Sequence, residues 1–261
     1  MITAGGETDY APYESYDEDG DPAGFNVDLL RAIGREVGFA LGPWQEQRER
    51  LQAGEVDVLG MFVSEARRIR VDFAEPNVIV SHRIFVPAGR EAVEGLEDLA
   101  GRSVVVQRGA YSHERLVATN LELELILVDD ERTGLLRLVR EGHDAALLTE
   151  HRARRVLEDE GLNGEVVSGP PVLPTKYAFA VRPGGDALLA RIDEGLARVK
   201  GQRRVRPHLR TLVDAPRGGL RAASNVARGW WRARVGPVGR RLVGMAGAST
   251  PPRRPDRAQR V

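Results

Sequence analysis

The sequence predicts an α/β protein whose sheets are largely parallel. Through the first 199 residues, short β-like runs alternate with segments of helical periodicity, as they do in α/β folds. Cysteine is absent, which excludes disulfides, Cys-ligated zinc and thiol catalysis. The net charge of zero hides a division, because residues 1–199 carry 22 basic and 36 acidic side chains, whereas residues 200–261 carry 16 basic and two acidic ones. The two parts are therefore interpreted separately.

The expected elements follow from periodicity and from residues that end helices. A helix is expected over 26–38, where apolar side chains recur on one face and Gly38 supplies the C-cap. A second helix, over 44–53, is closed by Gly54. The other expected strands lie at 58–63, 84–86, 103–107, 145–148 and 177–181, and the other expected helices begin at Ser112 or span 135–141, 151–160 and 186–199.

Residues 200–261 have a different composition. Arg, Gly, Ala and Pro dominate and the apolar residues keep no sustained period, which is typical of a disordered basic tail. Contact with a membrane surface or nucleic acid through Trp230, Trp231 and neighbouring arginines is the alternative, but glycines and Pro237 interrupt an amphipathic helix there. We therefore prefer the disordered tail and expect no nucleic-acid partner.

Residues 58–76 carry the pattern most specific for function. An apolar run ends in Ser64, Arg67 follows three residues later, and Phe73 lies six residues beyond it. A hydroxyl, a planar guanidinium and the free N–H groups of a helical turn can converge on one carboxylate. The spacing resembles the T-x-x-R…D-F-S-x-P-Y signature of type II periplasmic solute-binding proteins (bacterial extracellular solute-binding proteins, family 3), with Ser in place of Thr and Ala in place of Ser.

Further motifs of this family occur in order along residues 1–199. They lie at 7–14 with 19–29, at 51–57, at 96–112 and at 142–149. The resemblance implies a two-lobed fold with two hinge crossings, near 84–89 and 170–179. Lobe 1 would comprise 1–86 and 178–199, lobe 2 would comprise 87–177, and 200–261 would be the basic tail.

The resemblance also implies a ligand site between the lobes. Tyr10 would form an aromatic wall, and Glu7 would read a basic side chain of the ligand. The complete expected set is Glu7, Tyr10, Gly60, Phe62, Ser64, Arg67, Tyr111, Ser112 and Thr149. Phe62 and Tyr111 stand where the family has smaller residues, so they would narrow the pocket or make it more apolar.

Thr149 is a departure that bears on the ligand. Amino-acid binders of the family carry an aspartate at this position, which pairs with the ammonium of the ligand. A neutral hydroxyl cannot offset a buried ammonium charge. A carboxylate or another anion without an amine is therefore expected to fit at least as well as an amino acid.

The resemblance implies capture and release of a small polar, carboxylate-bearing solute by hinge closure. Delivery to an ABC importer permease is the main interpretation. A sensory input domain of a membrane histidine kinase or cyclic-nucleotide synthase is the alternative, because residues 41–44 and 60–65 resemble receptor-borne members of the family. A dehydratase on the same fold is a weaker alternative.

Catalysis and export signals have little support in the residues themselves. Nucleophile elbows, phosphate loops, dinucleotide fingerprints and metal-ligand spacings are absent, so we expect neither enzyme activity nor a cofactor. The histidines at 82, 113, 143 and 151 are interpreted as surface residues. The resemblance implies a periplasmic or extracytoplasmic location, although no basic-then-apolar signal peptide is visible in this sequence.

Overall fold

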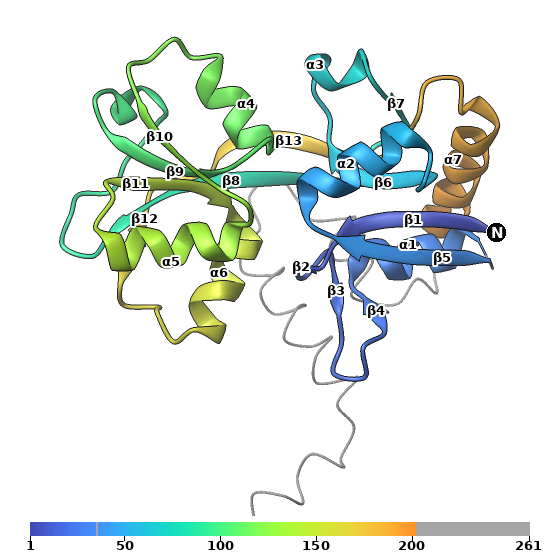
Figure 1. Cartoon of the computed structure of the whole chain (residues 1–261), viewed down its shortest axis with the longest axis horizontal. Coiled ribbons are helices and arrows are strands. Elements are labelled where there is room, and N and C mark those ends of the chain that lie inside the picture. The colour runs from blue at the N-terminus through green and yellow to red at the C-terminus, as the bar shows by residue number, and fades with distance from the viewer. Residues whose placement is uncertain (35, 202–261) are drawn as a thin grey trace, which may run out of the picture.

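A mixed ten-stranded sheet runs through the whole molecule in the computed structural model, which describes residues 1–34 and 36–201 (Figure 1). Its main order is β10-β9-β11-β8-β13-β6-β1-β5, with β12 beside β8 and β7 beside β13, and β2-β3-β4 form a separate small sheet. The strands are β1 Ile2–Glu7, β2 Asp9–Tyr10, β3 Glu14–Tyr16, β4 Pro22–Ala23, β5 Val37–Gly42, β6 Val58–Phe62, β7 Asp72–Phe73, β8 Val78–Pro87, β9 Ser103–Gln107, β10 Glu124–Val128, β11 Ala145–Thr149, β12 Val166–Ser168 and β13 Val172–Val181.

The sheet consists of two halves that are joined by two long strands. In one half β1 pairs in parallel with β5 and β6, and in the other β9 pairs in parallel with β10 and β11. Between them β8 pairs antiparallel with β11 and β13, and β13 pairs antiparallel with β6 (Figure 1). This is the expected two-lobed fold with two crossings. The residue boundaries of the lobes stay a prediction.

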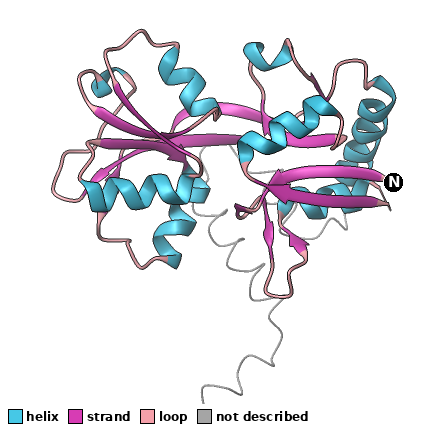
Figure 2. Cartoon of the chain, viewed as in Figure 1, coloured by secondary structure: helices cyan, strands magenta, loops and turns pink. Residues whose placement is uncertain are grey.

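Helices cover both faces of each half (Figure 2). They are α1 Phe25–Ile33, α2 Trp44–Ala53, α3 Glu65–Arg68, the 3-10 turn η1 Glu97–Leu99, α4 Tyr111–Val117, α5 Glu131–Glu141, α6 Glu150–Asp159 and α7 Asp186–Gly201. In lobe 2, Leu135 and Val156 of α5 and α6 pack on one face, and Leu116 of α4 packs on the other. In lobe 1, α1 and α7 share one core, while α2 packs on the opposite face.

Local signals located several elements correctly and one incorrectly. The helix over 44–53 is confirmed, with Gly54 at a φ of 81° after its last residue, and the strand at 103–107 is confirmed as well. The helix expected over 26–38 is wrong in its last third. It ends at Ile33 because Gly34 takes an extended conformation, and Val37 then begins β5, which pairs with β1. Neither β1 nor β5 was predicted.

The expected tail lies outside the described residues from 202 onward. The backbone of α7 reaches Gly201, slightly beyond the predicted end of the α/β part. No helix within residues 1–34 and 36–201 is both long and apolar enough to span a bilayer.

Candidate solute-binding site

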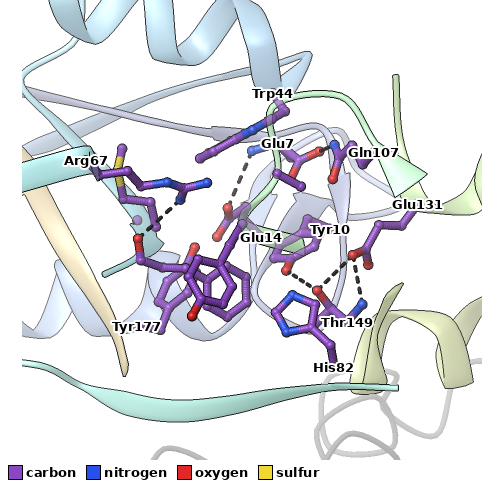
Figure 3. A pocket seen from close by; sticks show the side chains of 15 residues that line it. Glu7, Tyr10, Glu14, Trp44, Arg67, His82, Gln107, Glu131, Thr149 and Tyr177 are labelled. Carbon is purple, nitrogen blue, oxygen red and sulfur yellow. Dashed lines mark hydrogen bonds between the residues drawn. The ribbon is translucent and has the colours of Figure 1, made fainter. Parts of the chain in front are cut away.

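A cavity lies between the two lobes where several strands end. Glu7, Phe62, Gln107 and Thr149 are the last residues of β1, β6, β9 and β11, and all four line it. Ligands of open α/β sheets bind at such carboxyl ends of strands. The space open to water-sized molecules is about 20 Å³, enough for about one water. The lining residues are Glu7, Tyr10, Glu14, Trp44, Gly60, Met61, Phe62, Arg67, His82, Gln107, Ala110, Tyr111, Glu131, Thr149 and Tyr177 (Figure 3).

Seven of the nine expected site residues meet at this cavity, namely Glu7, Tyr10, Gly60, Phe62, Arg67, Tyr111 and Thr149. Ser64 and Ser112 do not line it. The Ser64 hydroxyl caps α3 by accepting a hydrogen bond from the Arg67 backbone N–H at 3.2 Å. The Ser112 side chain is fully buried within α4. Their assignment to the ligand site stays a prediction, and the structure gives Ser64 a capping role.

Six polar or aromatic lining residues were missed, namely Glu14, Trp44, His82, Gln107, Glu131 and Tyr177. The expectation that His82 lies on the surface is wrong, because this residue of the crossing strand β8 is only 1% exposed. The signal that could have found Gln107 and Glu131 is their position at or just after the carboxyl ends of β9 and β10.

The Arg67 guanidinium donates hydrogen bonds to three residues yet still faces the cavity. Its Nε donates to Glu114 Oε1 at 2.9 Å, and its two terminal nitrogens donate to the carbonyls of Phe62 at 3.2 Å and Gly109 at 3.3 Å. A guanidinium has five N–H donors. Two donors therefore remain without a partner among the described residues, which suits an incoming carboxylate.

The two lobes contact each other directly at the cavity. The Gly109 carbonyl accepts hydrogen bonds from Trp44 Nε1 at 3.0 Å and Arg48 at 3.2 Å, in addition to the one from Arg67. Gln107 donates a further hydrogen bond to Glu7 at 2.8 Å. Polar contacts therefore join the lobes at this cavity.

Three buried carboxyl groups line the same cavity. Glu7 Oε1 accepts from Gln107, and Glu14 accepts from the Asn26 side chain and, at 3.5 Å, from the Glu7 backbone N–H. Glu131 Oε1 accepts from the backbone N–H and the hydroxyl of Thr149, each at 2.8 Å. Of the described lining residues, Arg67 alone carries a permanent positive charge.

Burial disfavours the ionised form of these three carboxyl groups. Desolvation raises the pKa of Glu14 to about 7, raises the pKa of Glu7 well above its ordinary value, and also raises the pKa of Glu131. Burial, together with the nearby Arg67 charge, lowers the pKa of His82 to about 4, so this imidazole is neutral at pH 7. A bound cation would favour the ionised carboxylates.

Aromatic rings form the remaining wall. The Phe62 ring stacks on Tyr111 at 5.7 Å, lies 4.9 Å from His82, and meets Tyr177 edge-on at 5.2 Å. Gly60 is required beside them, because a Cβ there would lie 2.8 Å from the Tyr177 hydroxyl. Phe62 and Tyr111 both belong to this wall, and the narrowing of the pocket relative to other family members stays a prediction.

The cavity thus presents a guanidinium, buried carboxyl groups and aromatic faces to one solute. Figure 3 shows Arg67 and Glu131 at different ends of the group, with rings between them. The expectation that an amine would find no anion was drawn from the neutral Thr149 and its sequence neighbour Glu150, and it did not include Glu131. Because Thr149 holds the Glu131 carboxyl beside itself, the geometry removes that objection to an amino-acid ligand.

Comparison with known proteins agrees with this geometry. The model of the bacterial extracellular solute-binding proteins, family 3, matches residues 2–206. The chain belongs to this family. A relative described as a probable histidine-binding protein from Neisseria gonorrhoeae is 25% identical over 209 residues, covering 74% of this chain and 75% of the relative.

Two solved structures of similar shape extend the comparison for this solute-binding protein. A histidine kinase sensor domain with similarity to periplasmic binding proteins is 37% identical, with a TM-score of 0.72, covering 77% of this chain and 90% of the other. Holo ArgBP from T. maritima is 25% identical, with a TM-score of 0.70, covering 78% and 92%. The relatives cited are binding or sensing proteins.

Proposed function

We propose that this solute-binding protein captures an α-amino acid or a close analogue in the cavity between its lobes. Arg67 holds the carboxylate of the solute, and the buried carboxyl groups face its amine. The observation that carries the proposal is the presence of Arg67 and three buried glutamates around one cavity. Opposite charges at separate positions in the cavity match the two charges of a zwitterionic amino acid. A ligand that lacked either its carboxylate or its ammonium would leave the corresponding charge of the protein buried without a partner.

The excess of carboxyl groups over cations favours a solute with a positively charged or hydrogen-bond-donating side chain. A relative described as a probable histidine-binding protein and the solved arginine-bound form of ArgBP from T. maritima support this preference. The aromatic wall formed by Phe62, Tyr111 and Tyr177 would contact the planar or apolar part of such a side chain.

The solute is captured outside the cytoplasm and passed to a membrane partner. The main form of the proposal is delivery to an ABC importer permease, which is supported by relatives described as an amino-acid ABC transporter-binding protein and an ABC transporter glutamine-binding protein. A sensory input domain is the second candidate, because the 37% identical structure is a histidine kinase sensor domain. Both forms share the same binding chemistry. The lobes that close on the solute are proposed to be 1–86 with 178–199, and 87–177.

Thermal unfolding of the full chain tests the proposal, because a ligand that binds the folded state raises the midpoint by mass action. The panel contains L-arginine, L-histidine, L-glutamine, succinate and benzoate. At least one amino acid should raise the midpoint in a concentration-dependent way, while the two acids without an amine should not. A panel in which only succinate or benzoate stabilises the protein would refute the proposal.

A further inference from the structure

Glu131 occupies a fixed position at the edge of the cavity. It is the first residue of α5, and the preceding Asp130 caps this helix by accepting from the Thr133 backbone N–H at 2.7 Å. The Glu131 side chain is 4% exposed and lines the cavity. A helix start thus aims a desolvated carboxyl group into the site (Figure 3).

The two oxygens of this carboxyl group have different surroundings. Oε1 accepts two hydrogen bonds from Thr149, whereas Oε2 is buried and has no hydrogen-bond partner within the described part of the chain. A buried carboxylate oxygen without a donor is costly. Such an oxygen in a ligand cavity indicates a missing donor, which a solute can supply.

The other two carboxyl groups of the cavity differ from Glu131 in this respect. Both oxygens of Glu14 accept hydrogen bonds, from Asn26 and from the Glu7 backbone, and Glu7 Oε1 accepts from Gln107. The nearby guanidinium of Arg152 lies 2.6 Å from Asp9 and does not line the cavity. Glu131 is therefore the lining carboxyl group with a completely buried, unpartnered oxygen among the described residues.

We propose that Glu131 determines specificity by binding the α-ammonium group of the solute through Oε2, with Thr149 as its positioning residue. The inference rests on the proposed capture of an amino acid. One available oxygen suits a compact ammonium, whereas the bidentate contact that favours a guanidinium uses both oxygens of the carboxylate.

Thr149 acts through a short chain of hydroxyl groups. Its hydroxyl donates its single hydrogen to Glu131, so it accepts the hydrogen bond from Tyr10, whose hydroxyl oxygen lies 3.0 Å away. The chain Tyr10–Thr149–Glu131 joins the two lobes. It also fixes which oxygen of Glu131 is left for the solute.

The test pairs each amino acid with its deaminated analogue and each variant with a control. The full chain is titrated calorimetrically with L-arginine and 5-guanidinopentanoate, and with L-histidine and imidazolepropionate. Wild type is compared with Glu131→Gln, and with Glu124→Gln as control, because Glu124 is an exposed acid on the same lobe. Thr149→Val and Thr149→Ser test the positioning role. Circular dichroism and thermal unfolding establish that each variant is folded.

Wild type should prefer the amino acid, and Glu131→Gln should reduce this preference by about ten- to a hundredfold, as expected for a charge-assisted hydrogen bond. Glu124→Gln should leave the preference unchanged. Thr149→Val should reduce the preference for the amino acid, whereas Thr149→Ser, which keeps the hydroxyl group, should retain it. A general loss of stability would not produce this difference between the two variants.

Equal affinity of wild type for an amino acid and its analogue would overturn the inference without any variant. An unchanged preference in folded Glu131→Gln would do so as well, while leaving the proposed function intact. If the wild type binds none of the amino acids in the thermal unfolding panel described above, both the proposed function and this inference are refuted.

Discussion

Glu14 should make the unliganded protein less stable as the pH rises from 5 to 8. Burial raises its pKa from 4.5 to about 7, so the folded state binds a proton that the unfolded state has released. The stabilisation linked to that proton is fully present below pH 4.5 and is lost as the pH rises through about 7. A shift of this size corresponds to about 3 kcal/mol, because one pKa unit is worth about 1.4 kcal/mol.

Urea denaturation of the full chain at pH 5, 6, 7 and 8 measures this effect. Glu14→Gln removes the titrating group and keeps the shape of the side chain, so the difference between wild type and variant isolates it from Glu7 and Glu131, whose pKa values shift in the same direction. Across this pH range, the free energy of unfolding of the wild type should fall by about 3 kcal/mol relative to that of the variant. A difference between the two proteins that stays constant with pH would refute the reasoning.

Three further outcomes are expected. Arg67→Ala should weaken amino-acid binding by about ten- to a hundredfold in calorimetry. Arg68→Ala should change the affinity little, because the half-exposed Arg68 side chain pairs with an exposed acid. Equal losses of affinity in the two variants would show that Arg67 does not bind the carboxylate of the solute. Gly60→Ala should lower the unfolding temperature and the affinity because its Cβ would crowd Tyr177, while Gly164→Ala meets no atom within 4 Å and serves as control. Affinity for L-arginine should rise from pH 5 to pH 8 as the buried carboxyl groups ionise, and a flat profile would contradict their contact with the cation.

Elements that depend on local signals were predictable. The helix over 44–53 combines a helical composition with a terminal glycine in the left-handed region, and β9 contains a run of three valines at its centre. By contrast, β1 and β5 are glycine-containing strands that stabilise each other through parallel pairing across more than thirty residues. Their stability is tertiary, and a short window of sequence does not contain it.

The residues of the candidate site were likewise predictable only where the signal is local in sequence. Arg67 was found because its spacing from Ser64 lies within one segment, whereas Gln107 and Glu131 join the cavity only once the strand order is known. The neutral hydroxyl of Thr149 cannot by itself offset the charge of an ammonium group. Its partner Glu131 is eighteen residues away in sequence, so the carboxyl group that it holds could not be inferred from that position.

A crystal structure of the full chain with the tightest-binding amino acid of the panel tests the central claim most directly. The account predicts that the solute lies in the cavity between the lobes, with its carboxylate on the Arg67 guanidinium and its ammonium within hydrogen-bond distance of Glu131 Oε2. A solute bound outside this cavity would contradict the account. So would the reverse orientation, with the carboxylate of the solute facing the buried glutamates.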